Sequence, residues 1–212
     1  MLRIRYLFSA LLLMLLFTAC EDIFTNNVFS NFQRDPDNLS KDQLLSRAAY
    51  VGGDRAEAAK LYEALKTKIS AGDDAEVFLV MTNLALTASG VLDELQDLVK
   101  IGIDGDLDDA EALSGALDDK LNNVNYTYVQ EAQQQILAAR AAGGTVSTDQ
   151  YVFVTIGLIM QEANEQGTRV GDLTFVPDSP LASFVDEAVA DLEAQGKSGT
   201  ALRELRIFLG SE

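Results

Sequence analysis

The chain has 212 residues, of which 33 are Asp or Glu and 16 are Lys or Arg, giving a formal net charge of −17. A field of this sign repels phosphate backbones and anionic lipid headgroups, so we expect no nucleic-acid partner. The sequence contains no histidine and one cysteine, which leaves no disulfide and removes the commonest general base and metal ligand.

The first twenty residues have the order of a secretory leader. Arg3 and Arg5 supply a positive start, an apolar run extends from Leu7 to Phe17, and small residues precede Cys20. The run is shorter than the ~20 residues that a membrane-spanning helix needs. The segment Phe17-Thr18-Ala19-Cys20 resembles the lipobox of bacterial lipoproteins. This resemblance implies a signal peptide over residues 1–19, cleavage before Cys20 and a lipid on the Cys20 thiol; a cleaved leader without lipid is the alternative.

The same resemblance implies a location in the bacterial cell envelope, where the N-terminal lipid attaches the protein to the membrane. Glu21 follows the cysteine, whereas an Asp at this position retains lipoproteins in the inner membrane of enterobacteria. We therefore expect the periplasmic face of the outer membrane rather than the inner membrane. A Gram-positive membrane surface is the remaining alternative.

The sequence predicts a tether over residues 20–39 and a single folded domain over residues 40–212. The tether is polar, contains Pro36 and has no sustained hydrophobic period. Beyond Ser40, apolar residues recur every three or four positions, with Gly or Asn at the breaks and acidic or hydroxyl residues at the starts. This pattern predicts an all-α fold of about eight to nine helices, near residues 41–50, 55–70, 74–88, 91–101, 108–121, 126–142, 149–165, 181–194 and 199–209.

Two of the predicted helices are apolar almost all round, over Val77–Leu86 and Val152–Met160. Such a helix is stable in water only when other helices surround it, so we expect both in the central layer. Gly157 would let a neighbouring helix approach closely. The β-branched run Tyr151–Ile156 also suits a strand, but the hydroxyl and acidic residues before it favour a helix. A short extended piece is expected at Leu173–Val176.

Part of the chain resembles the turn and second helix of a tetratricopeptide repeat. The matching segment is Gly53-Asp54-Arg55-Ala56-Glu57-Ala58-Ala59-Lys60-Leu61-Tyr62. In that family a small residue such as Ala58 lets two antiparallel helices approach, and an aromatic such as Tyr62 fills the space between repeats. No second copy of the motif follows at the ~34-residue period of the family. The resemblance implies stacked helical hairpins; an irregular helical bundle is the alternative.

A second, internal similarity relates two segments about 75 residues apart. Glu57-Ala58 through Ala64 to Val77-Phe78 matches Glu131-Ala132 through Ala138 to Val152-Phe153. Both pair a long Ala-rich amphipathic helix with a hydrophobic helix, as stacked repeats require. Two pseudo-repeats, over about 41–101 and 108–209, would explain the similarity. Chance likeness between Ala-rich helices is the alternative.

The motifs of common catalytic sites are missing. The sequence has no Gly-x-Ser-x-Gly elbow and no Gly-x-x-x-x-Gly-Lys-Ser/Thr phosphate loop, so we expect no enzyme activity and no cofactor. Asp104, Asp106 and Asp108 stand at alternate positions, as the first ligands of a calcium loop do. The turn glycine and the bidentate glutamate of such a loop are lacking. Capping of a helix that begins near Asp108 is the preferred interpretation, and calcium binding is the alternative.

Polar side chains interrupt the hydrophobic helices at Thr82, Asn83, Tyr151 and Asn164. A ligand pocket between these helices would explain them, and so would hydrogen bonds between helices. The leading hypothesis is a non-catalytic helical-repeat module that binds or assembles with another envelope protein or peptide. The alternative is a small-molecule-binding lipoprotein associated with a transporter, with these four residues at its pocket.

Overall fold

The computed structural model of the chain describes residues 35–95, 118–173, 176, 179–197, 199 and 202–203. The chain divides into two compact units, Met1–Leu39 and Ser40–Glu212. In the first unit the described residues form a 3₁₀ turn, η2 (Pro36–Asn38), capped by the Asp35 carboxylate, which accepts from the Asp37 N–H at 3.2 Å. The predicted leader and Cys20 lie outside the described residues.

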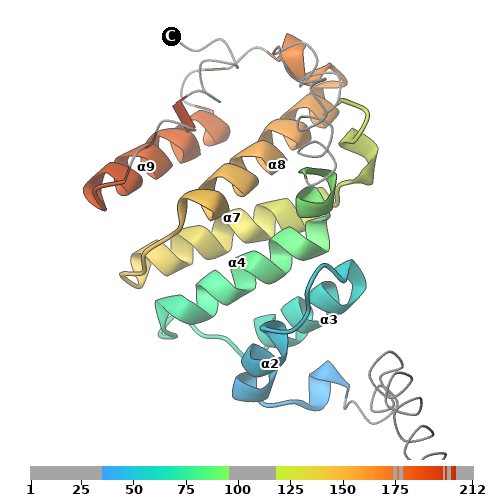
Figure 1. Ribbon diagram of the computed structural model, residues 1–212, viewed down its shortest axis with the longest axis vertical. Coiled ribbons are helices and arrows are strands. Elements are labelled where there is room, and N and C mark those ends of the chain that lie inside the picture. Colours follow the sequence, from blue (N-terminus) through green and yellow to red (C-terminus); the bar gives the residue numbers. More distant parts are fainter. Residues whose placement is uncertain are drawn as a thin grey trace, which may run out of the picture. The chain divides into compact units, whose positions relative to one another are not determined.

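The described part of the second unit is built from helices, without a strand, and so confirms the prediction of an all-α fold (Figure 1). Two short 3₁₀ turns, η3 (Leu121–Asn123) and η4 (Val170–Asp172), lie between the longer helices. Residues 91–95 are also helical. The longer helices are α2 (Lys41–Ala48), α3 (Arg55–Lys66), α4 (Ala75–Ser89), α7 (Tyr126–Ala141), α8 (Thr148–Gln166) and α9 (Pro180–Ala194).

The observed bounds follow the predicted ones closely for these longer helices, although α2 and α3 end a few residues earlier than expected. The predicted helices 91–101, 108–121 and 199–209 lie largely outside the described residues, so the count of eight to nine stays a prediction. The two middle residues of the extended piece expected at Leu173–Val176 also lie outside them. The segment Tyr151–Ile156, which also suited a strand, lies within α8.

Side-chain caps define where several helices begin. The Ser40 hydroxyl accepts from the Gln43 N–H while the Gln43 side chain accepts from the Ser40 N–H, which forms a capping box at the start of α2. Ser147 and Gln150 form the same reciprocal pair at the start of α8. These bonds satisfy backbone N–H groups that have no partner inside the helix.

Successive helices run antiparallel and pack on one another in chain order (Figure 1). The start of α3 meets the end of α4, where Arg55 Nη2 donates to the Gly90 carbonyl at 3.2 Å. The start of α7 also meets the end of α4, because the Asn125 N–H donates to the Ser89 carbonyl at 2.8 Å. Short connections join α2 to α3, α3 to α4 and α7 to α8, as is usual for antiparallel helices in contact.

The helix α4 contacts α2 and α8 in addition to its antiparallel neighbours α3 and α7. Near the start of α8, Gln150 Nε2 donates to Asn83 Oδ1 at 2.9 Å. About two turns later, Gly157 lies against Val91, just beyond the end of α4. The helices α4 and α8 therefore run parallel, and α4 has the central position that its apolar sequence predicted.

Gly157 is a point of close helix contact, as the sequence indicated. A Cβ added there would lie 2.9 Å from Val129 Cγ1 and 3.2 Å from Val91 Cγ2. Both valines are fully buried. The α4–α7–α8 contact therefore depends on the missing side chain, because a methyl group has no free space at this position.

An ion-pair cluster around the buried Glu94 joins the start of α3 to the segment after α4. Arg55 Nε lies 2.6 Å from Asp93 Oδ2, and Arg55 Nη2 lies 3.0 Å from Glu94 Oε1. Lys120 Nζ lies 3.0 Å from Glu94 Oε2. Burial raises the pKa of Glu94, but hydrogen bonds from Lys120 and Arg55 outweigh it and hold that pKa below its usual value. The carboxylate therefore stays charged although Glu94 is 7 % exposed.

A second polar cluster joins α3 to α7. The buried Tyr62 hydroxyl donates to Glu131 Oε2 at 2.5 Å and accepts from Gln135 Nε2 at 3.1 Å. Lys66 pairs with the same glutamate, and the Tyr128 ring stands edge-on to Tyr62 with the centroids 5.6 Å apart. Burial and the neighbouring Glu131 raise the pKa of Tyr62, so its hydroxyl remains a donor.

Candidate functional site

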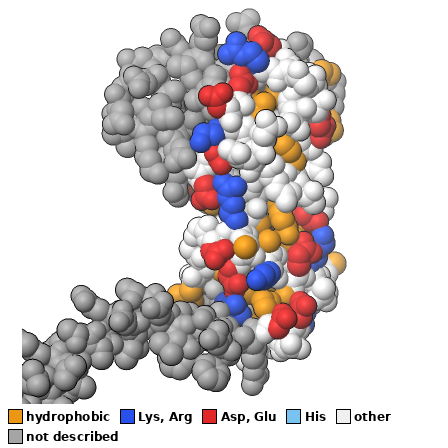
Figure 2. Space-filling view, turned by 90° about the vertical axis from the view of Figure 1, so that its right-hand side faces the viewer, with side chains coloured by type: hydrophobic (Ala, Val, Ile, Leu, Met, Phe, Trp, Pro, Cys, Tyr) orange, Lys and Arg blue, Asp and Glu red, His pale blue; other side chains and the backbone are white. Residues whose placement is uncertain are grey.

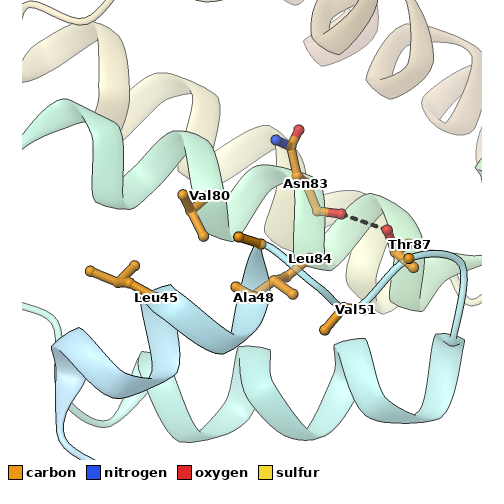
Figure 3. A pocket seen from close by; sticks show the side chains of 9 residues that line it. Leu45, Ala48, Val51, Val80, Asn83, Leu84 and Thr87 are labelled. Carbon is orange, nitrogen blue, oxygen red and sulfur yellow. Dashed lines mark hydrogen bonds between the residues drawn. The ribbon is translucent and has the colours of Figure 1, made fainter. Parts of the chain in front are cut away.

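A groove lies between α2 and α4 and encloses a cavity of about 210 Å³ (Figure 3). One wall comes from α2 and the turn after it, and the other comes from α4. Apolar side chains dominate both walls. The lining residues are Leu45, Ala48, Ala49, Val51, Gly52, Val80, Asn83, Leu84 and Thr87.

The groove exists because α2 is too short to cover the apolar surface of α4. α2 has eight residues and buries only Leu44 fully, whereas α4 has fifteen residues that are apolar almost all round. Val80 is therefore left half-buried opposite Leu45 at one end of the groove, with Leu84 and Ala48 in the middle (Figure 3). Exposed hydrocarbon of this kind has a favourable free energy of burial by a partner.

The polar groups of the groove are occupied by contacts inside the protein. The Thr87 hydroxyl donates to the Asn83 carbonyl at 3.0 Å. The Asn83 side chain points away from α2, and its Oδ1 accepts from Gln150 at 2.9 Å (Figure 3). The groove therefore presents mainly apolar surface to a ligand and few polar groups that could form hydrogen bonds with it.

An exposed aromatic follows α2, and the charges of α2 are paired. Tyr50, in the turn after α2, is 87 % exposed. Both basic residues of α2 are paired with carboxylates, Lys41 with Asp73 and Arg47 with Glu57. On the face drawn in Figure 2, acidic and basic side chains likewise lie next to one another with apolar side chains between them. In the whole chain, acidic residues outnumber basic ones twofold.

The residues that the sequence proposed for a ligand pocket do not share one cavity. Thr82 is fully buried and its hydroxyl donates to the Phe78 carbonyl of its own helix at 3.0 Å. Asn83 lines the α2–α4 groove, as described above. Asn164 is exposed, about 20 Å further along α8 than Tyr151 at ~1.5 Å per residue.

Tyr151 belongs to the contact between α8 and α9. Its ring is fully buried beside Phe184, and its hydroxyl donates to Asp191 Oδ2 at 2.7 Å. Burial and the hydrogen bond to Asp191 raise the pKa of Tyr151. Hydrogen bonds between helices therefore account for Asn83 and Tyr151, whereas the Thr82 hydroxyl bonds within its own helix.

The remaining sequence-based sites lie outside the described residues, namely Cys20 and the calcium candidate Asp104, Asp106 and Asp108. Within the part of the chain that the structure describes, no three His, Cys, Asp or Glu side chains stand close enough to hold a metal ion. Among the described helices, none is both long and apolar enough to cross a bilayer.

Comparisons of this chain with protein-family models, with curated proteins and with solved structures give no match.

The groove was not predicted, although the sequence carried a signal for it. The segment Val77–Leu86 is apolar almost all round. The helix predicted at 41–50, which contacts this segment in the folded chain, has few apolar residues with which to cover it. A mismatch between a fully apolar helix and a short polar neighbour leaves apolar surface uncovered. Recognising it required the knowledge that α2 and α4 are in contact.

Proposed function

We propose that this chain is a lipid-anchored, non-catalytic interaction module of the bacterial cell envelope. Its body is a stack of three helical hairpins, α2–α3, α4–α7 and α8–α9, and its α2–α4 groove receives an apolar segment of another envelope protein or peptide. The groove between these two helices, with the exposed Tyr50 between its lining residues Ala49 and Val51 in the chain, is the observation that carries the proposal.

The hairpin stack is supported by the order and direction of the contacts. The first helices of the second and third pairs, α4 and α8, run parallel, and α2 also contacts α4. The second helices are linked in turn, α3 to α7 through Tyr62 and α7 to α9 through an ion pair of Arg140 with Glu187 at 2.7 Å. α2 and α4 begin at Lys41 and Ala75, which are 34 residues apart and thus at the tetratricopeptide period.

The anchor rests on the lipobox-like segment that ends at Cys20. Replacing Cys20 by Ala should move the protein from the membrane fraction to the soluble fraction of the envelope, because no basic patch is available to hold it on lipid. Mass spectrometry of the native N-terminus should find acyl chains on the Cys20 sulfur. An unmodified thiol on the membrane-bound form would contradict the proposal.

The interaction role is tested by photo-crosslinking in living cells. A benzophenone amino acid at Tyr50 of the full-length protein should give one discrete adduct upon irradiation, since this exposed position lies between Ala49 and Val51, which line the groove. Ala49→Arg, which places a charged chain in the groove, should abolish the adduct. Ala56→Arg is the matched control, because Ala56 is an exposed residue of α3 that does not line the groove.

Two results would count against the interaction role. One is a crosslink at Tyr50 that survives Ala49→Arg, which would show that the partner does not use the groove. The other is the absence of any adduct from Tyr50 while a probe on α9 at Glu187 gives one, because the binding face would then lie elsewhere.

A further inference from the structure

The two ends of the α2–α4 groove differ in their charged surroundings. The helices α2 and α4 run in the same direction, because each is antiparallel to α3 (Figure 1). Leu45 and Val80 lie opposite each other at the end of the groove nearer the starts of both helices (Figure 3). Lys41 Nζ, in the first turn of α2, donates to Asp73 Oδ1 at 2.5 Å, just before α4. The two helix starts are therefore close together in space beside the Leu45–Val80 end.

Three exposed carboxylates stand at these helix starts. Asp42 is three positions before Leu45 on α2, and Glu76 is four positions before Val80 on α4, so each lies one turn away on the face of a groove residue. Asp74 is the residue just before α4. Between the residues that the structure describes, no ion pair or hydrogen bond uses these three carboxylates.

Helix capping does not occupy these side chains. The first turn of a helix favours acidic residues because its N-terminus carries partial positive charge, which explains Asp42 and Glu76 without giving either carboxylate a bonding partner. Asp74 is the N-cap of α4, yet its side chain accepts no hydrogen bond from the helix. Lys41 is already held by Asp73.

The charge on Lys41 is itself stabilised by this surrounding. A hydrogen bond to Asp73 raises the pKa of Lys41, against a smaller lowering by desolvation. The negative charges of Asp73, Asp42 and Asp74 raise it further. The Leu45–Val80 end of the groove therefore favours positive charge beyond that of Lys41.

The carboxylates near the other end of the groove are occupied. Glu57 pairs with Arg47, and Asp54 accepts from the Glu57 N–H at 3.0 Å as the N-cap of α3. Asp93, next to the turn after α2, pairs with Arg55. A cationic group of a partner would thus find unoccupied carboxylates at the Leu45–Val80 end and not at this one.

The size of the cavity fits side chains of a short chain segment. Its volume of about 210 Å³ is below the ~300–1,000 Å³ of small-molecule sites. Along α4 the lining extends from Val80 to Thr87, which is about 10 Å at ~1.5 Å per residue. An extended segment spans this length in about three residues at ~3.3 Å each.

We propose that the partner segment in the α2–α4 groove carries a lysine or arginine beside its apolar residues, and that this cation contacts Asp42 and Glu76 where the two helices begin. The inference rests on the interaction role proposed above. It adds the chemistry and the placement of the partner segment, because its basic residue lies at the Leu45–Val80 end and its apolar side chains lie in the groove.

Charge reversal in living cells tests this proposal, with the benzophenone amino acid at Tyr50 of the full-length protein as the probe. Asp42→Lys with Glu76→Lys should lower the yield of the Tyr50 adduct about tenfold or more, because two attractive contacts become repulsive. The matched control is Asp119→Lys with Asp172→Lys. It changes the net charge equally at exposed positions that do not line the groove, and should leave the yield unchanged.

A milder variant separates binding from folding. Asp42→Asn with Glu76→Gln removes the charges and nearly keeps the shapes of the side chains. In isolated envelopes, raising NaCl from about 50 to 500 mM should lower the adduct yield of the wild type severalfold and that of this variant much less, because salt screens an attraction that the variant lacks. The same salt effect on both proteins would show that the two carboxylates do not bind the partner, and would overturn the inference.

Mass spectrometry of the wild-type adduct identifies the partner segment. Asp42 and Tyr50 are about 12 Å apart along α2, a length that an extended chain spans in about four residues. A Lys or Arg is therefore expected within about five residues of the crosslinked position. A crosslinked segment without one would overturn the inference.

The outcomes distinguish this inference from the interaction role itself. A Tyr50 adduct that Ala49→Arg abolishes, but that Asp42→Lys with Glu76→Lys leaves at full yield, would overturn the inference and keep the interaction role. The absence of any Tyr50 adduct would overturn both.

Discussion

Glu94 makes the stability of the fold depend on pH. Its pKa in the folded protein lies below the usual 4.5, because hydrogen bonds from Lys120 and Arg55 outweigh the effect of burial. A lowered pKa means that the stabilisation is fully present above the unfolded-state pKa and is lost as pH falls through the folded-state pKa. We therefore expect the free energy of unfolding to decrease below about pH 4.5.

Glu94→Gln should lower the free energy of unfolding at pH 7 by about 1.5–3 kcal/mol, because it removes two bonds to charged donors. The difference from the wild type should shrink as pH falls below the unfolded-state pKa toward the folded-state pKa, because protonation then removes the negative charge of Glu94. Urea denaturation at several pH values measures both effects. Asp42→Asn, at an exposed position of α2, serves as the control. A difference that is constant from pH 7 to pH 3 would contradict the assignment.

Gly157 tests the close packing of α8 on α4 and α7. Gly157→Ala gains about 1 kcal/mol of helix propensity, but the added methyl meets Val129 Cγ1 at 2.9 Å and should cost about 1–3 kcal/mol of overpacking. We expect net destabilisation, measured by urea unfolding. Gly53→Ala is the matched control, since its nearest neighbour, Asp93 Oδ1, lies 3.7 Å away. In the double variant with Val129→Ala, a cost smaller than the sum of the two single costs would identify the clash as the cause.

Gly157 and Glu94 differ in how well their contacts could be predicted from the sequence. Gly157 stood out because a glycine within an apolar helix usually marks a close approach of another chain segment. Glu94 carried no such mark, because its partner Arg55 is 39 positions away and is positioned by the fold. The Tyr62–Glu131 bond, between residues 69 positions apart, was hidden for the same reason. Local sequence identifies a buried contact, but not the partner that satisfies it.

At the scale of helices, loss of the capping box of α8 and loss of that of α2 should affect the stability of the protein differently. Ser147→Ala removes the cap of α8, which is part of the core, and should lower global stability by about 1 kcal/mol. Ser40→Ala removes the cap of α2, which buries only Leu44 fully. Its effect should be confined to α2 and appear as faster amide hydrogen exchange there, with little change in global unfolding. Equal global losses in the two variants would show that α2 unfolds together with the core.

The helices themselves were predictable because their determinants are local. The hydrophobic period and the residues at the starts gave 126–142 for α7 and 181–194 for α9, against the observed Tyr126–Ala141 and Pro180–Ala194. The α2–α4 groove was not predictable in this way. It arises from the difference in length between two helices that meet only in the folded chain.

At the scale of the whole molecule, acidic residues exceed basic ones by 17, so the folded chain repels itself at low salt. Raising NaCl from about 10 to 150 mM shortens the Debye length from about 30 to 8 Å and should increase the melting temperature. KCl should act equally, because the effect is screening rather than ion binding. A melting temperature that falls with salt would mean that the ion pairs of Arg55 and Lys66 outweigh the net repulsion.

The packing of helices in chain order has a mechanical consequence. The chain before Ser40 joins directly to α2, whose contacts are with α3 and α4 and whose only fully buried side chain is Leu44. A pulling force applied from the N-terminal side therefore acts on the contacts of α2 first and separates this helix from α3 and α4 turn by turn. At that stage the contacts of α4 with α7 and of α8 with α9 are not broken. Separation of α2 removes one wall of the α2–α4 groove. A bound segment would therefore be released at a force that leaves the rest of the protein folded.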